Sequence, residues 1–228
     1  MNLNSPMFHE AKCIADFGGR FAFGVSLGRD FAVVLHVMSQ LTDMKRHAFF
    51  HWTKYPKLLP YQARYLNLLE KMYGFKAEIQ IWPESKKAKQ QDVIREFMER
   101  NGCSLCIQGF RMDESLQRRG MLKKLTDGID YVRHYGYPLR SWTSKTVRGY
   151  CTANKVPLSI EYSLGYKHDF QDHRGQKAYV LRHQISEEDY QCAIAQDPNV
   201  EIDYVRYAND PNFLYGKLGK DGSLFAGR

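Results

Sequence analysis

A single stretch at residues 21–39, FAFGVSLGRDFAVVLHVMS, constrains the fold more than any other part of the chain. Phe21, Phe23 and Val25 alternate as in a buried strand, and residues 32–38 form an apolar run typical of a helix packed on most sides. Residues 26–30, SLGRD, connect the two. This order predicts a strand that leads through a short turn into the N-terminus of a buried helix.

The turn at residues 26–30 has the composition of a phosphate-binding site. Backbone amides at a helix N-terminus have no partner within the helix, and the helix dipole favours an anion beside them. Gly28 allows a phosphate to approach the backbone, and the Asp30 carboxylate is suited either to cap the helix or to hold Mg²⁺. The alternative is an ordinary strand-to-helix turn with Asp30 as its N-cap, and this turn alone supports both interpretations equally.

The chain then alternates between strands and helices up to about residue 108. Alternation of this kind predicts an α/β fold in which a mostly parallel sheet carries helices on both faces. The predicted strands lie at residues 47–53, 77–82 and 103–108, and the predicted helices run from Pro60 to Gly74 and over residues 92–100.

The later part of the chain carries shorter signals. A strand or extended segment ends in YPLRSW, and Thr143 is the predicted N-cap of a helix that runs to about residue 154. The remaining predictions are a turn at residues 162–166, a strand at residues 178–182, a helix from Ser186 to about residue 196, and an irregular tail over about the last thirty residues.

Composition restricts the compartment and the partners of the chain. Its 228 residues carry a formal net charge of +8, which suits an anionic partner such as a nucleotide or a nucleic acid without requiring one. Its five cysteines are scattered and odd in number, so no disulfide framework is predicted and a reducing cytoplasm is the expected location. The sequence shows neither a signal peptide nor an apolar run of membrane-spanning length, so no membrane partner is expected.

A second loop with the sequence GFRMDESLQRR, residues 109–119, follows the fourth predicted strand. Ligands of open α/β sheets bind where parallel strands end, so this loop is expected to meet the turn described above. Arg111, Arg118 and Arg119 would then face a bound phosphate, with the two acidic residues of the loop orienting the arginines or holding a metal. The alternative is a solvated charged loop in which Glu and Arg pair on a helix surface.

Three segments match the motifs of one protein family in the same order. Residues 26–31, SLGRDF, correspond to a loop of the form SxGKDS, and residues 109–118 match GxRxxESxxR. A looser match runs from Pro138 to Tyr166. With these motifs the chain resembles the phosphoadenosine phosphosulfate (PAPS) reductase family, within the adenine-nucleotide alpha-hydrolase or N-type ATP pyrophosphatase superfamily. The resemblance covers roughly residues 15–185.

The resemblance implies a Rossmann-like sheet with an adenine nucleotide, either ATP or a sulfonucleotide, bound across its carboxyl edge with Mg²⁺. It implies a nucleotide-binding domain at residues 1–185, followed by a C-terminal helix and irregular tail at residues 186–228. Chemistry at the alpha phosphate, as in an ATP pyrophosphatase or adenylyl transferase, is assigned to Arg29, Asp30 and Arg111, and Asp30 is also the expected metal ligand. The residues expected to bind the nucleotide are Ser26, Leu27, Gly28, Thr53, Gly109, Glu114, Ser115 and Arg118.

Several departures from the family pattern bear on activity. Phe31 replaces the second serine of the loop, Arg29 replaces a lysine, and Leu27 stands where many relatives have glycine. The Glu-Cys-Gly context of the reductases' nucleophile and the paired cysteines of their iron–sulfur clusters are missing from the sequence. An iron–sulfur cluster is therefore not expected, and ATP chemistry is favoured over sulfonucleotide reduction. Cys192, on a predicted helix, is expected to be structural.

Two other groups of side chains contain metal-ligand residue types. Cys103 and Cys106 form a CxxC pair, but residues three apart on a strand face opposite sides, so a place in the core is predicted for them. A loop at residues 168–173 holds two histidines and two aspartates, His168, Asp169, Asp172 and His173, which either bind a metal or are simply solvated.

The sequence supports two functions of different class. The first is an enzyme that binds ATP or a sulfonucleotide and acts at its alpha phosphate. The second is a catalytically degenerate relative that serves as a nucleic-acid- or protein-binding module, and either one is compatible with a homo-oligomer or a protein complex. Basic clusters that suit nucleic acid, with solvated helix faces as the alternative, lie at Lys86, Lys87 and Lys89 and at Arg118, Arg119, Lys123 and Lys124.

Overall fold

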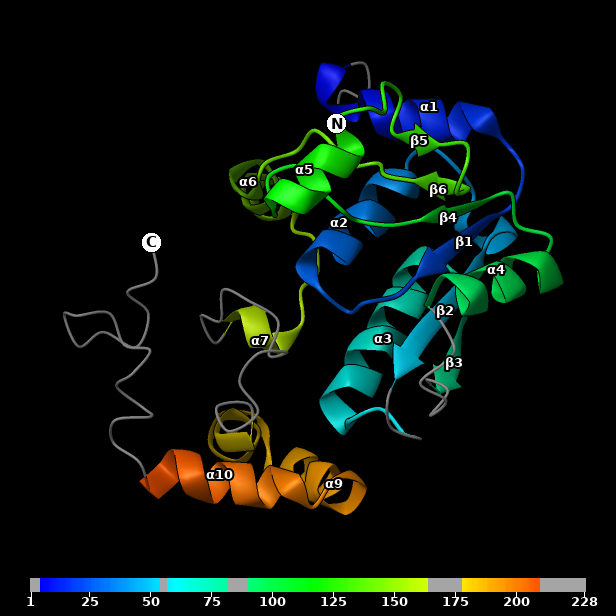
Figure 1. The fold of residues 1–228 in the computed structure, drawn as a ribbon. Helices are drawn as coiled ribbons and strands as arrows, with labels where there is room; N and C mark the ends of the chain where they lie inside the picture. Colours follow the sequence, from blue (N-terminus) through cyan, green and yellow to red (C-terminus); the bar gives the residue numbers. More distant parts are fainter. Residues whose placement is uncertain (1–4, 54–56, 82–89, 164–177, 210–228) are drawn as a thin grey trace. The chain divides into compact units, whose positions relative to one another are not determined.

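The computed structural model describes residues 5–53, 57–81, 90–163 and 178–209, and the chain divides into two compact units (Figure 1). The first unit comprises Met1–Tyr55 and Tyr65–Ser159, and the second comprises Pro56–Arg64 and Ile160–Arg228. The nucleotide-binding domain expected at residues 1–185 remains a prediction.

The first unit is built on a six-stranded sheet with the order β3-β2-β1-β4-β6-β5. All neighbouring strands run parallel except β5, which pairs antiparallel with β6 at one edge. The prediction of a mostly parallel sheet is therefore confirmed. The strands are β1 (Phe21–Gly24), β2 (Ala48–Thr53), β3 (Ala77–Ile81), β4 (Leu105–Ile107), β5 (Ile129–Asp130) and β6 (Tyr135–Gly136).

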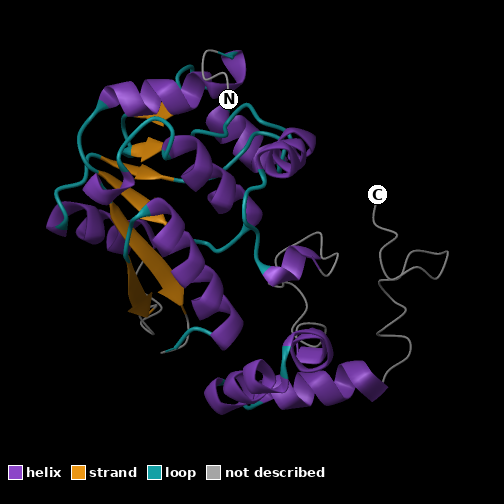
Figure 2. Cartoon of the chain, turned by 180° about the vertical axis from the view of Figure 1, so that it is seen from behind, coloured by secondary structure: helices purple, strands orange, loops and turns teal. Residues whose placement is uncertain are grey.

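Helices lie on both sides of the sheet (Figure 2). None of the described helices is both long and apolar enough to cross a bilayer. In chain order the helical elements are η1 (Pro6–Phe8), α1 (His9–Phe17), α2 (Arg29–Met38), η2 (Met44–Arg46), α3 (Pro60–Tyr73), α4 (Gln90–Arg100), α5 (Leu116–Leu122), α6 (Ser144–Asn154), α7 (Ile160–Ser163), η4 (Leu181–Ile185), α9 (Glu187–Gln196) and α10 (Asn199–Asn209).

Alternating side chains on β1 and β2 give the sheet two buried faces. On one face the Phe23 ring stacks on Phe49, with centroids 4.9 Å apart, and Phe49 stacks on Phe75 at 4.0 Å. On the other face Phe50 packs against Phe97 of α4, with centroids 4.7 Å apart. Burial of both faces explains why these strands appear in the sequence as nearly continuous apolar runs.

The strand order reverses at β1, which lies between β2 and β4. From β1 the chain moves outward to β2 and β3, and it then returns to β4 on the other side of β1. In open α/β sheets the ligand crevice lies at the carboxyl ends of the two strands at such a reversal. The turn after β1 and the loop after β4 therefore share the edge of the sheet that the sequence predicted.

Both CxxC cysteines contribute to the core, but the predicted geometry is wrong. Cys106 lies on β4 and is fully buried, and burial raises the pKa of its thiol to about 12. Cys103 precedes the strand and packs against the same cluster of buried residues, so the two do not face opposite sides of the sheet. Both thiols are free.

Two helix starts are confirmed at their caps. The Thr143 hydroxyl accepts a hydrogen bond from the Thr146 amide at 3.1 Å, and α6 begins directly after it. The Ser186 hydroxyl accepts from the Asp189 amide at 3.0 Å at the start of α9. The turn predicted at residues 162–166 is wrong where it can be seen, because α7 includes residues 162 and 163; the rest lies outside the described residues.

The strand predicted at residues 178–182 is wrong, because residues 178–180 are helical and η4 follows them. Ala178 and Leu181, three residues apart, both pack against the fully buried Tyr190. Spacing by three places two side chains on one face of a helix but on opposite faces of a strand. Packing within the second unit therefore overrides the local preference of AYVLR for a strand.

The tail predicted to be irregular contains α10. Val200 and Tyr204, four residues apart, pack against the same cluster as α9, so one face of α10 has a partner to cover it. The prediction is therefore wrong for Asn199–Asn209, and residues 210–228 lie outside the described part of the chain.

Candidate functional site

The turn after β1 leads into α2 through Gly28, which is the N-cap. The Gly28 carbonyl accepts the first helical hydrogen bond from Ala32 at 3.1 Å, and the Gly28 amide donates to the Ser26 hydroxyl at 3.4 Å. Asp30 is the second residue of the helix, so the interpretation of Asp30 as N-cap is wrong. Its carboxylate lies in the first turn, where the helix dipole favours a negative charge.

Leu27 has a backbone conformation that L-residues rarely adopt, with φ of 58°. Its side chain is buried, so packing holds the residue in this left-handed region. The turn therefore has the backbone shape that glycine adopts freely, although a leucine occupies the position.

The loop after β4 delivers Arg111 to this turn. Arg111 Nη2 lies 3.4 Å from Asp30 Oδ2 and 3.6 Å from Glu114 Oε1, and Nη1 lies 3.3 Å from Asp113 Oδ1. The residue is only 4% exposed. A buried guanidinium is stable only when it is paired and hydrogen bonded, and three carboxylates meet that need here. The alternative of a solvated loop is therefore wrong for Arg111.

The start of α6 completes this group of side chains. Arg111 Nη1 donates to the Ser144 hydroxyl at 3.2 Å, and the Ser144 amide donates to Asp113 Oδ2 at 2.5 Å. We call these five residues, Asp30, Arg111, Asp113, Glu114 and Ser144, the Arg111 cluster. Sequence reasoning missed Ser144, and the signal that could have found it is its position directly after the predicted cap Thr143.

Glu114 and Arg118 form an ion pair. A Glu–Arg pair was expected under the alternative interpretation, in which this loop is charged and solvated. Glu114 also accepts a hydrogen bond from the Arg111 amide at 3.1 Å, so it fixes both arginines. The Ser115 hydroxyl caps α5 by accepting from the Arg118 amide at 3.1 Å. The Arg118 guanidinium lies over the Phe110 ring, 4.1 Å from its centroid, a contact that the sequence motif did not predict.

Glycine at position 109 allows the two loops to approach each other. A Cβ atom there would lie 3.4 Å from both the carbonyl carbon and the Cβ of Asp30. That separation is at the tight end of ordinary contact, so the backbone after β4 runs directly alongside the first turn of α2. The predicted meeting of the two loops is thus present in the geometry.

The other residues that the sequence singled out lie outside the Arg111 cluster. Arg119, expected to face a phosphate, is exposed, and its Nε donates to the Met112 carbonyl at 3.5 Å. Burial raises the pKa of the Cys151 thiol to about 11; the charge of Arg29 lowers this pKa and the charge of Asp30 raises it. Thr53 ends β2, on the strand next to β1, and is half-buried. His51, which the sequence did not single out, donates from Nδ1 to the Val25 carbonyl at 2.6 Å, and its burial lowers the pKa of the imidazole.

The three carboxylates of the Arg111 cluster surround an arginine. Within the described residues no group of three or more His, Cys, Asp or Glu side chains has the arrangement of a metal site. Asp30 as a metal ligand therefore remains a prediction. The loop at residues 168–173 and the lysines at positions 86, 87 and 89 lie outside the described residues.

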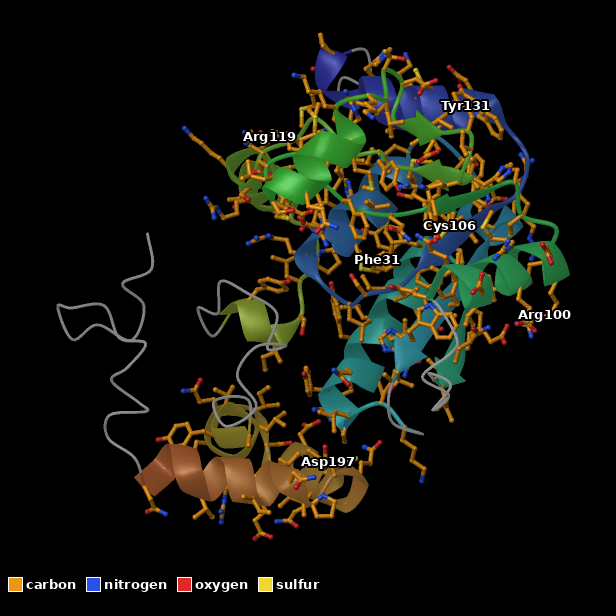
Figure 3. The ribbon with its side chains drawn as sticks, viewed as in Figure 1. Phe31, Arg100, Cys106, Arg119, Tyr131 and Asp197 are labelled. Atoms are coloured by element: carbon orange, nitrogen blue, oxygen red, sulfur yellow. The ribbon has the colours of Figure 1, made fainter. Side chains whose placement is uncertain are left out.

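Phe31, which replaces the loop serine of the family, is 4% exposed and packs in the core (Figure 3). Its side chain is thus removed from the surface where an anion would lie. The substitution deletes a hydroxyl and adds a buried aromatic ring to α2.

No family model and no curated protein matches this sequence. Several solved structures match its fold. FMN adenylyltransferase of Candida glabrata, solved with ATP, aligns with a TM-score of 0.53 and 11% identity over 70% of this chain and 58% of that chain. PAPS reductase from Candida auris aligns with a TM-score of 0.48 and 14% identity over 73% and 90% of the two chains. NH3-dependent NAD synthetase from Campylobacter jejuni aligns with a TM-score of 0.46 and 11% identity over 92% and 96%.

The match spans less than two thirds of the FMN adenylyltransferase chain, at 58%. At 11% identity it shows a shared fold and nothing finer. The Rossmann-like fold class expected from the sequence is confirmed, and the family resemblance is supported at the level of the fold alone.

Proposed function

We propose that this chain, which has the fold of the adenine-nucleotide alpha-hydrolases, binds an adenine nucleotide at the carboxyl edge of its sheet and acts at the alpha phosphate. The observation that carries this proposal is the buried Arg111, held between the first turn of α2 and the loop after β4. These two segments flank the reversal of strand order, where open α/β sheets bind ligands.

Within the described part of the chain, the hydrogen bonding of Arg111 leaves one of its donors unused. Its Nη1 and Nη2 atoms face carboxylates and Ser144, whereas the buried Nε has no hydrogen-bond partner among the described residues. A buried donor without a partner costs about 1–3 kcal/mol, more for a charged group. A phosphate oxygen would satisfy this donor, so the residues present fit a nucleotide.

The remaining residues have complementary roles in this proposal. Gly28 and the amides that follow it would receive the phosphates, and Arg29 and Arg118 would add positive charge on two sides. Mg²⁺ bound with the nucleotide would be held by Asp30 and would supply further positive charge. Preorganised cations stabilise charge that develops on pyrophosphate as it leaves the alpha phosphate.

Adenylyl transfer or pyrophosphate release fits the cysteines of the first unit better than sulfonucleotide reduction does. A reductase needs a thiolate nucleophile, and a thiol with a raised pKa is a poor source of one. Burial raises the pKa of Cys106 to about 12 and of Cys151 to about 11, and it also raises the pKa of Cys103. We therefore favour ATP as the substrate.

The proposal is tested by calorimetry with ATP, adenosine phosphosulfate and PAPS, each with Mg²⁺. Arg111→Met should weaken ATP binding about tenfold to a hundredfold, since a hydrogen bond to a charged group contributes about 1.5–3 kcal/mol. Arg119→Met is the matched control, because Arg119 is exposed and lies outside the cluster. Asp30→Ala should remove the dependence on Mg²⁺. Thermal melts of each variant separate lost binding from lost folding.

Absence of binding of all three nucleotides to the folded wild-type protein would overturn the proposal. The second candidate, a catalytically degenerate binding module, would then be favoured. It is supported by Leu27 and by the buried Phe31, which change the phosphate loop at two positions. Equal losses in Arg111→Met and Arg119→Met would place the nucleotide elsewhere.

A further inference from the structure

The helices next to the Arg111 cluster carry an unbalanced charge. Residues 116–124, which contain α5, have four basic residues and no acidic residue, and residues 144–155, which contain α6, have three and none. These seven positive charges nearly equal the net charge of the whole chain, which is +8. We call them the basic face: Arg118, Arg119, Lys123, Lys124, Lys145, Arg148 and Lys155.

The members of the basic face are available to a partner. All except Arg118 are exposed, and Arg118 is half-buried. Arg119 lies on the side of α5 away from the sheet (Figure 3). Helices α5 and α6 are neighbours in the view of Figure 1, and Ser144 at the start of α6 hydrogen bonds to the loop that precedes α5. The two groups of charges therefore lie on helices that are joined through the Arg111 cluster.

The acidic residues of the loop before α5 do not neutralise these charges. Asp113 and Glu114 precede α5, and both are engaged by Arg111. Glu114 also pairs with Arg118, which leaves six exposed cations without an acidic residue in their own segments. Like charges held close together on two helices raise the local potential and attract a polyanion.

We propose that the basic face binds nucleic acid. Nucleic-acid interfaces are polar and strongly positive, and phosphate contacts supply most of their affinity. A membrane surface or the apolar centre of a protein interface would need exposed hydrophobic area as well. The described segments 116–124 and 144–155 expose little hydrophobic area: of their large hydrophobic residues, Leu116 is the exposed one, at 82%. This inference stands apart from the proposed nucleotide site, since none of the six exposed cations belongs to it.

The test is fluorescence anisotropy with a labelled single-stranded DNA, its RNA equivalent and a DNA duplex, over a series of salt concentrations. The triple variant Arg119→Ala, Lys123→Ala, Arg148→Ala removes three charges from the basic face. The matched control is Lys45→Ala, Lys71→Ala, Arg133→Ala, which removes three exposed charges from other surfaces of the first unit.

We expect the wild-type protein and the control to bind with similar affinity and the basic-face variant at least about tenfold more weakly. Log affinity falls with log salt, and each lost phosphate contact makes this dependence less steep by about 0.7–0.9. The slope of the variant should therefore be smaller in magnitude by about 2. ATP binding measured by calorimetry should be the same in all three proteins. If the wild-type protein binds the oligonucleotides but not ATP, the proposed function fails and the inference about the basic face stands.

Two outcomes would overturn the inference. One is an equal loss of oligonucleotide affinity in both triple variants, which would mean that binding depends only on the net charge of the protein. The other is the absence of oligonucleotide binding at low salt, with or without binding to vesicles that contain an anionic phospholipid. Vesicle binding without oligonucleotide binding would assign the basic face to a membrane surface.

Discussion

Two buried ion-pair clusters in the first unit differ in how completely their groups are satisfied. In the first, Glu10 Oε1 lies 3.2 Å from Arg140 Nη1 and Oε2 accepts from the Ser141 hydroxyl at 3.2 Å. Arg140 Nε donates to the Leu122 carbonyl at 2.8 Å. The Arg111 cluster has three carboxylates for one guanidinium, and its Nε has no partner among the described residues.

The difference separates a structural role from the functional role that we propose. The Glu10 cluster, which comprises Glu10, Arg140 and Ser141, has one charge of each sign and ties α1 to the segment before α6. The Arg111 cluster has an excess of negative charge and an unused donor, and it lies where the strand order reverses. Incomplete satisfaction of a buried group requires a compensation, and a bound ligand provides one.

The largest effect on stability is expected in the satisfied cluster. Glu10→Ala should lower the free energy of unfolding by about 3 kcal/mol, because it removes a buried carboxylate and leaves Arg140, whose side chain is only 14% exposed, without its ionic partner. Urea denaturation measures this change. The control is Glu78→Ala, which removes an exposed partner of Arg100 and should cost at most about 1 kcal/mol. Similar losses in the two variants would contradict the structural role of the Glu10 cluster.

A second satisfied group, at the amino end of the sheet, should make stability depend on pH. The buried His47 accepts from the Phe21 amide through Nδ1 at 3.1 Å, so its proton lies on Nε2, which donates to the Thr42 hydroxyl at 3.0 Å. Burial, and next the charge of Arg46, lower the pKa of His47 from 6.5 to about 4. Between these values the unfolded chain binds more protons than the folded one, so stability falls as pH falls.

The loss between pH 6.5 and pH 4 should reach about 3 kcal/mol for His47, with additions of the same sign from His36 and His51, whose pKa values burial also lowers. Urea denaturation at several pH values measures it. His47→Asn keeps an acceptor for the Phe21 amide and removes the titration, so its profile should be flatter. An unchanged profile in this variant would show that other groups control the acid sensitivity.

The sequence predicted the parts of the fold that local pattern controls. The alternation in β1 and the apolar run of α2 are strong periodic signals, and Pro60 and Gly74 mark the ends of α3. The strand wrongly expected at residues 178–182 has a pattern of only five residues, and its helical form depends on packing against Tyr190. Short patterns are decided by partners that are distant in the chain.

The candidate site was predictable in position and less so in its contacts. The rule for open sheets brought the turn at Asp30 to the loop at Arg111, and the ion pair between them is present. The burial of Arg111 was not predictable, because its charged loop has the composition of a solvated one. Ser144 entered the site only through the tertiary placement of α6.

A smaller effect is expected in the turn itself, where backbone strain can be separated from side-chain burial. At ordinary positions alanine is more stable than glycine, but Leu27 has a φ of 58°, at which a Cβ is unfavourable. Leu27→Gly should therefore be more stable than Leu27→Ala by about 1 kcal/mol, although both lose the burial of leucine. Urea denaturation of the two variants checks the order. The reverse order would mean that the left-handed turn does not persist without leucine.

The smallest change in stability is expected in the unsatisfied cluster, and it sharpens the contrast with Glu10. Asp113→Asn removes one of three negative charges around Arg111 and keeps an oxygen that can accept from the Ser144 amide. The free energy of unfolding should change by less than about 1 kcal/mol, because Asp30 and Glu114 still pair with the guanidinium.

ATP binding to Asp113→Asn should become tighter, since the variant lowers the repulsion between the cluster and an anionic nucleotide. Calorimetry and urea denaturation on the same preparation measure both quantities. A loss of 3 kcal/mol or more, the size expected for Glu10→Ala, would show that the Arg111 cluster is also structural and that its excess of carboxylates is needed for folding.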